Sequence, residues 1–225
     1  MSDAPAPSAS ELAGGALGPN VGLGGVAFER LVAVIARLRR DCPWDAEQTH
    51  LTLVKHLVEE AGETVDAIEA GSITDLKEEL GDLLIQVCFH AEIARTDAQF
   101  TIDDVIVGVT NKLISRHPYV FGDDETPDDM MASWEAGKRA EKQRDSALEG
   151  IPEAMNAVAR AAKVVTRVRD VHLDVPLEDA SITADETGQA LLSLIERAQA
   201  SGVDPDQALR ASLRTLEAQV RAAEH

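Results

Sequence analysis

Aromatic residues, basic residues and long apolar runs are all scarce in this chain of 225 residues. Only 3% of residues are aromatic although 44% are hydrophobic, so the apolar set is mostly aliphatic and suits the packing of helix on helix. Lys and Arg number 21 against 40 Asp and Glu, and the net charge of −19 argues against general binding to nucleic acid polymers or anionic lipid. No apolar run approaches the roughly 20 residues of a membrane span, so we expect no membrane partner.

Cysteine is nearly absent too. Cys42 and Cys88 are far apart and form no CxxC motif, which is typical of a reduced compartment. The N-terminal residues lack the basic and apolar regions of a secretory signal peptide, so we expect a cytoplasmic protein. Residues 1–25 are largely Ala, Gly, Pro and Ser, which bury too little surface to offset the entropy of ordering, and this composition predicts a disordered arm.

Helical periodicity dominates the rest of the chain. Apolar residues recur at spacings of three and four from Phe28 onward, and Pro43 interrupts this pattern. No convincing run of alternating strand residues occurs, so we predict an all-α fold, a helical bundle. The further helical stretches are expected at about 53–70, 74–94, 102–116, 153–170 and 185–222, with a polar helix or linker at about 132–144.

A weak internal repeat suggests a second, reduced copy of the first helical region. Residues 185–189 resemble residues 78–82, with Gln189 in the place of Asp82. Chance similarity between two amphipathic helices is the alternative. The predicted organisation is an arm at 1–25, a helical domain at 26–122, a linker or charged helix at 123–150 and a reduced second helical domain at 151–225.

The most informative feature is two pairs of acidic residues on consecutive helices. Glu60 and Glu63 are three residues apart, as are Glu79 and Asp82, so each pair lies on one face of its helix. The short connection between the helices predicts an antiparallel hairpin. Counting about 1.5 Å per residue from the turn places Glu63 opposite Glu79 and Glu60 opposite Asp82. The spacing therefore predicts four converging carboxylates.

Four ionised carboxylates this close repel one another. Two unit charges about 6 Å apart repel by roughly 3 kcal/mol at an effective dielectric constant of about 20, and six such pairs are comparable with the stability of a whole domain. Either some groups are protonated, or the face points to water, or cations bind there. Oxygen ligands without His or Cys favour Mg²⁺, with Mn²⁺ as a substitute. A solvated acidic face is the simpler alternative.

Neighbouring residues favour a buried inner face over a solvated one. Apolar residues such as Leu57 and Leu84 are expected to place both helices in a core. Gly62 and Gly81 lie in mid-helix, where Gly is unfavourable by about 1 kcal/mol relative to Ala. They would allow the helices or a ligand to approach closely, or serve helix packing alone.

Three further residues are candidates for substrate binding. Lys112 and Arg116 are four residues apart on one helix face and suit phosphate oxygens, although ion pairing with acidic groups or a solvated face is the alternative. Trp44 either stacks on a base or packs in the core. Residues 47–50 have the Glu-x-x-His form of di-iron bundles, but no second such motif occurs, so we disfavour that reading.

Three longer segments complete a recognisable pattern. They are CPWDAEQTH at 42–50, EELGDLL at 78–84 and KLISRHPYVF at 112–121. Together with the ExxE and ExxD pairs, they cover about residues 28–122 and resemble the MazG family of all-α nucleoside triphosphate pyrophosphohydrolases. Relatives that act only on dUTP, dCTP or phosphoribosyl-ATP are a narrower alternative, and the CPWD and RHP segments favour MazG.

The resemblance implies a helical bundle that forms a homodimer and cleaves nucleoside triphosphates to monophosphate and pyrophosphate with Mg²⁺, as in nucleotide-pool house-cleaning. It implies that Glu59 orients or deprotonates the attacking water, and it favours a phosphate role for Lys112 and Arg116. The second half lacks the EExxE motif and is expected to be inactive. A non-catalytic helical interaction or regulatory protein that retains the fold is the alternative function. The metal ligands implied by the resemblance are Glu60, Glu63, Glu79 and Asp82.

Overall fold

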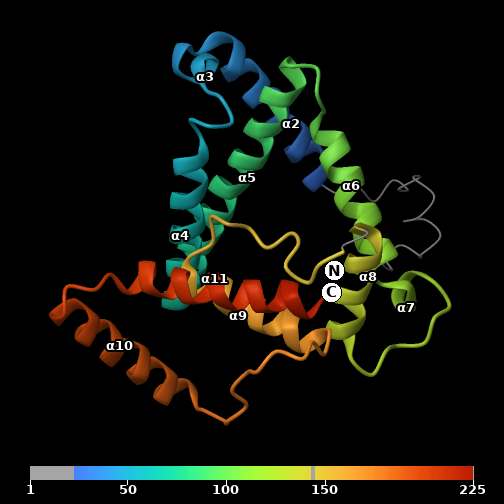
Figure 1. Ribbon diagram of the computed structural model, residues 1–225. Helices are drawn as coiled ribbons and strands as arrows, with labels where there is room; N and C mark the ends of the chain where they lie inside the picture. The colour runs from blue at the N-terminus through green and yellow to red at the C-terminus, as the bar shows by residue number, and fades with distance from the viewer. Residues whose placement is uncertain (1–22, 143–144, 225) are drawn as a thin grey trace. The chain divides into compact units, whose positions relative to one another are not determined.

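A computed structural model of the protein describes residues 23–142 and 145–224 (Figure 1). Helices are the only regular secondary structure among these residues, and the predicted all-α fold is confirmed. No helix in the described ranges is both long and apolar enough to cross a membrane. The chain divides into two compact units, Met1–Pro127 and Asp128–His225, and each has its own hydrophobic core.

The first unit contains two long helices, a hairpin of two further long helices, and two short helices. Cys88, Phe89 and Ile93 of one hairpin helix form its core with Ile35 and Leu53. Phe89 is the one aromatic residue among these five buried side chains. The helices are α2 (Leu23–Asp41), α3 (Pro43–Glu47), α4 (Val54–Ala70), α5 (Ile73–Thr96), α6 (Ile102–Ser115) and α7 (Pro118–Phe121).

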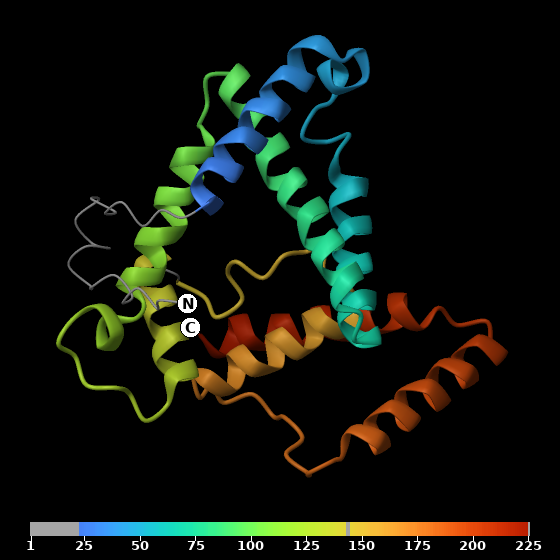
Figure 2. The same ribbon diagram turned by 180° about the vertical axis from the view of Figure 1, so that it is seen from behind.

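Helices α4 and α5 form the predicted antiparallel hairpin and lie side by side in both views (Figures 1 and 2). Gly71 ends α4 with a left-handed backbone, φ +68°, a conformation that Gly adopts without the steric cost of a side chain. The hydroxyl of Ser72 then accepts a hydrogen bond from the backbone N–H of Asp75 and caps α5. A turn this short sets the register of the two helices.

The second unit contains α8 (Met130–Lys142), α9 (Ala157–Asp170), α10 (Ala184–Ala200) and α11 (Pro205–Ala223). Val164, Val168 and Val220 are fully buried where α9 packs on α11. The guanidinium of Arg160 donates to the Glu217 carboxylate at 2.7 Å across the same pair of helices. The derivation of this unit from a second, reduced copy of the first stays a prediction.

Several helix boundaries differ from those expected. The stretch 185–222 is two helices, because Gly202 at φ +69° and the Pro at position 205 separate α10 from α11. Helix α2 begins at Leu23 and not near Phe28, and residues 1–22 of the expected arm lie outside the described residues.

The expectation that apolar residues of the hairpin lie in a core is wrong for the single chain. Leu57 is 40% exposed and Leu80 is 53% exposed, because the first unit has too few helices to cover every face of α4 and α5. The same outward faces carry further exposed aliphatic side chains at Val58, Val65, Ile68, Leu84 and Val87.

Candidate active site

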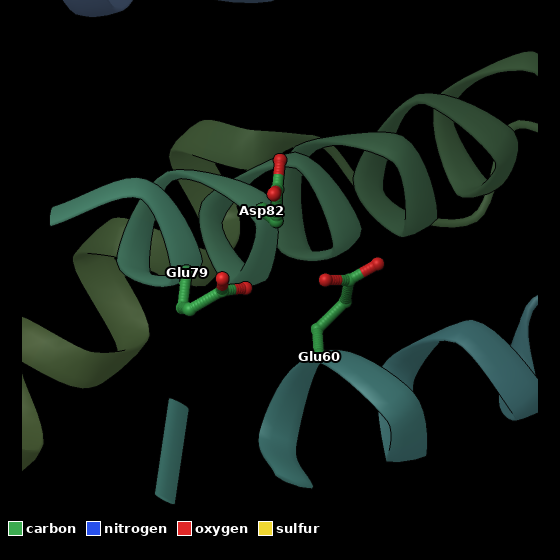
Figure 3. Close-up of side chains that lie close together, drawn as sticks. All are labelled: Glu60, Glu79 and Asp82. Atoms are coloured by element: carbon green, nitrogen blue, oxygen red, sulfur yellow. The ribbon is translucent and has the colours of Figure 1, made fainter. Parts of the chain in front are cut away.

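Three of the predicted carboxylates converge between α4 and α5. Glu60 extends from α4 toward the stretch of α5 that carries Glu79 and Asp82 (Figure 3). One carboxylate oxygen from each residue lies within 4.8 Å of the others, and all three residues are partly buried. A search of the described residues for three or more acidic, His or Cys side chains that could hold a metal ion finds this group.

The electrostatics of the group agree with its geometry. Burial raises the pKa of Glu60, and the carboxylates of Asp82 and Glu63 raise it further. Burial also raises the pKa of Glu79, with additional contributions from Glu63 and Asp82. These carboxyls are therefore harder to ionise than isolated ones, because His56 lowers the pKa of Glu60 by less than burial and the neighbouring carboxylates raise it.

The fourth predicted ligand, Glu63, lies outside the group of three. Its side chain is exposed, although its charge acts more strongly on the Glu79 carboxyl than that of any other residue. This agrees with the register counted from the turn, which placed Glu63 opposite Glu79. Its role as a metal ligand stays a prediction.

Glu59, predicted to orient or deprotonate the attacking water, lies beside the group on α4 and faces water. Its carboxylate Oε2 is 3.1 Å from Nδ1 of His56, one helical turn earlier. The histidine therefore orients this carboxylate, and the exposed side chain remains accessible to solvent.

A cavity of about 360 Å³ adjoins the carboxylates. Glu60 and Asp82 form part of its lining, and apolar side chains of α2 and α5 form most of the rest. Its volume falls within the range of small-molecule sites, about 300–1,000 Å³. The apolar lining consists of Leu31, Val34, Ile35, Leu38, Leu53, Ile85 and Phe89.

Trp44 lines this cavity from α3. The side chain is 55% exposed, so its interpretation as a core residue is wrong. Its ring contacts the His56 ring edge to face, with centroids 6.1 Å apart. Exposure at the mouth of an apolar cavity leaves one surface of the indole available for a ligand.

Two contacts hold the segment that carries Trp44. The Arg39 guanidinium of α2 donates hydrogen bonds to the backbone carbonyls of Asp45 and Gln48 at 2.6 and 2.8 Å. Nδ1 of His50 lies 2.8 Å from Nδ1 of His90 on α5, and the two rings are stacked. The short α3 helix is therefore fastened to both α2 and α5.

The two predicted phosphate-binding residues are not part of this group. Lys112 and Arg116 neither line the cavity nor belong to the carboxylate group. Helix α6 packs against α5 near their connection and then diverges from it (Figures 1 and 2). Arg116 is only 8% exposed and already engages other groups, whereas Lys112 is partly exposed.

Three polar residues of the cavity were missed in the sequence. Asp45, His56 and Gln86 all line it. A signal for Gln86 was present, because it follows Asp82 by four residues and therefore shares its helix face. His56 carried the same signal, because it precedes Glu60 by four residues on α4, whereas the position of Asp45 depends on the turn between α3 and α4.

Comparison with known proteins agrees with this site. The MazG nucleotide pyrophosphohydrolase domain matches residues 48–121, which include both carboxylate helices. The chain is 35% identical over 212 residues to the nucleoside triphosphate pyrophosphohydrolase/pyrophosphatase MazG of Thermotoga maritima, covering 84% of this chain and 82% of that protein. The chain belongs to the MazG family.

Other relatives extend over most of this MazG chain or over its first half. An uncharacterised 26.1 kDa protein of Streptomyces cacaoi is 46% identical over 207 residues, 90% of this chain and 84% of that protein. The crystal structure of a MazG-related protein from Thermotoga maritima is 28% identical and matches 49% of this chain and 98% of that one, with a TM-score of 0.44. The resemblance found in the sequence is confirmed, and the protein is a nucleoside triphosphate pyrophosphohydrolase, a hydrolase acting on acid anhydrides.

Proposed function

We propose that this MazG protein hydrolyses nucleoside and deoxynucleoside triphosphates to monophosphate and pyrophosphate with Mg²⁺ held by Glu60, Glu79 and Asp82. The observation that supports this most strongly is the convergence of three carboxylates from two helices within 4.8 Å, next to an apolar cavity. The charged group suits a polyphosphate with its cation, and the cavity suits a nucleoside.

The donor set fits Mg²⁺ or Mn²⁺. Both ions prefer carboxylate oxygens, and ligands on opposite sides of Mg²⁺ are about 4 Å apart. The three carboxylate oxygens lie within 4.8 Å of one another, so these residues would hold one such ion. The raised pKa values of Glu60 and Glu79 reflect burial and repulsion that a divalent cation offsets. When bound, the ion supplies positive charge to the triphosphate oxygens, which an acidic protein otherwise repels.

Glu59 is the proposed base for the attacking water. Its exposed carboxylate lies one residue from the ligand Glu60, and His56 orients it at 3.1 Å. The water oxygen forms a bond to phosphorus, the bond to the leaving phosphate oxygen breaks, and the proton passes to the Glu59 carboxylate. Attack at the α-phosphorus follows from the family resemblance.

We also propose a homodimer, in which outward faces of the hairpin are covered by a second copy. Leu57 and Leu80 are among the exposed aliphatic residues that support it, since soluble monomers seldom expose large contiguous apolar patches. Lys112 keeps its proposed phosphate role in that assembly. The proposed location of the protein is the cytoplasm. Its proposed role is to clear unwanted nucleotides from the cellular pool.

The test is a panel of the eight common ribonucleoside and deoxyribonucleoside triphosphates, incubated with the full chain and Mg²⁺. Products are resolved by phosphorus NMR. We expect monophosphate and pyrophosphate in equal amounts, and no turnover in EDTA. Release of inorganic phosphate with diphosphate would contradict the reaction, and no turnover of any member would favour the non-catalytic alternative.

A further inference from the structure

The side chain of Gln86 forms part of the cavity wall and has a buried oxygen without a partner in the described part of the chain. Gln86 is 8% exposed, and its carbonyl oxygen Oε1 is fully buried with no hydrogen-bond partner among the described residues. Gln86 lines the same cavity as Glu60 and Asp82. Because buried polar side-chain atoms are nearly always hydrogen-bonded, an unpartnered acceptor at a cavity indicates that a ligand supplies the donor.

The position of Gln86 fits the base end of a nucleotide. Gln86 lies one turn beyond Asp82 on α5, about 6 Å further along the axis, which leaves room for a sugar between a phosphate near Asp82 and a base near the amide. Phe89 lies three residues beyond Gln86, and Ile35 of α2 also contributes to the apolar lining. Flat, weakly polar rings suit such walls.

We infer that Gln86 hydrogen-bonds the edge of the nucleobase and contributes affinity for the base without selecting one base. The inference rests on the proposed function. A carboxamide offers one acceptor and one donor side by side, and every common base has a donor next to an acceptor on its edge. Rotation of the amide by about 180° exchanges its two groups, so one residue matches all four bases.

The test uses nucleoside monophosphates, which bind without turnover. Calorimetry in the presence of Mg²⁺ measures the affinity of the protein for dAMP, dGMP, dCMP and TMP. It also measures the affinity for 2-deoxyribose 5-phosphate, which lacks the base. We expect Gln86→Leu to weaken the binding of each of the four nucleotides by about tenfold, the value of one or two hydrogen bonds. The affinity for deoxyribose phosphate should not change. Gln99→Leu, at an exposed site outside the cavity lining, is the control and should change none of these affinities.

A second measurement uses the wild-type protein and a modified nucleotide, so its result does not depend on whether a Gln86 variant folds. The wild-type protein should bind dAMP about five- to tenfold more tightly than its 6-desamino analogue, because Oε1 accepts from the amino group. In Gln86→Met, which retains side-chain length, the two should bind equally. Equal binding by the wild-type protein would overturn the inference.

A purely structural role for Gln86 would give a different pattern. Loss of affinity for deoxyribose phosphate equal to that for the nucleotides would overturn base recognition. Failure of this inference leaves pyrophosphate release by the wild-type protein intact, whereas failure of the proposed function removes it. The two failures are therefore distinguishable.

Discussion

At the residue scale, the carboxylate group is unfavourable when ionised without a cation, and the same feature favours binding of a cation. Glu60, Glu79 and Asp82 hold oxygens within 4.8 Å of one another, at a site where burial and mutual repulsion oppose ionisation. The same arrangement favours a divalent cation, so the residues that destabilise the metal-free chain are the ones proposed to act in hydrolysis.

Removal of one ligand charge should abolish most activity. We expect Glu60→Gln and Asp82→Asn each to lower kcat/KM by about 100-fold or more, because a neutral amide holds Mg²⁺ far less strongly than a carboxylate. Glu69→Gln, an exposed acid on the same helix α4, is the matched control and should retain full turnover. Circular dichroism checks that the helices persist, and full activity in either ligand variant would contradict the assignment.

The pKa of Glu79 predicts a pH dependence of stability without metal. Because folding raises this pKa above its ordinary value of 4.5, the folded chain holds more protons than the unfolded chain between the two values. The free energy of unfolding therefore falls as pH rises through that window. In EDTA, Glu79→Gln should gain stability relative to the wild type as the pH rises above the ordinary carboxyl value of 4.5, as measured by urea unfolding. A relative stability that is constant, or that moves the other way, would count against the raised pKa.

At the scale of elements, helix positions could be predicted because apolar residues recur at helical spacing. The same counting placed Glu60 opposite Asp82 across the hairpin. It could not place Trp44, because the α3 turn depends on tertiary contacts from Arg39 and His90. Burial was mispredicted on α4 and α5, because periodicity identifies an apolar face but not the element that covers it.

The two glycines expected to permit close approach meet no such contact among residues 23–142 and 145–224. A Cβ atom at Gly62 or Gly81 would have no neighbour within 4 Å outside its own helix. Their small size therefore has no packing role that the single chain explains. Gly71 differs, since its left-handed φ of +68° is needed for the turn.

This contrast predicts opposite signs for two substitutions. Gly71→Ala should destabilise the protein by about 1 kcal/mol, because an alanine is strained at positive φ. Gly108→Ala, in mid-helix on α6 with open space around it, should stabilise the protein by about 0.5–1 kcal/mol. Urea unfolding measures both. Equal signs would show that contacts beyond the single chain decide these positions.

At the scale of the whole molecule, the candidate site lies in the first unit. The carboxylates and the cavity lie entirely within Met1–Pro127, and this unit has a core separate from that of the second. The second unit carries no carboxylate group of this kind among its described residues. Its proposed contribution is to assembly.

Truncation tests this division. We expect residues 1–127 alone to bind Mn²⁺ with an affinity within about threefold of the full chain, because every proposed ligand is retained. Sedimentation should show the full chain as a dimer and the truncated chain as a weaker one. Loss of Mn²⁺ binding on truncation would show that the second unit contributes to the site.

The most direct test of the account is the binding of Mn²⁺ measured by electron paramagnetic resonance, since it detects the ion without requiring turnover. The wild-type chain and the Glu69→Gln control should bind Mn²⁺ alike, whereas Glu60→Gln and Asp82→Asn should each bind it at least about tenfold more weakly. Equal affinity in all four proteins would show that these carboxylates do not hold the ion, and would contradict the proposed site.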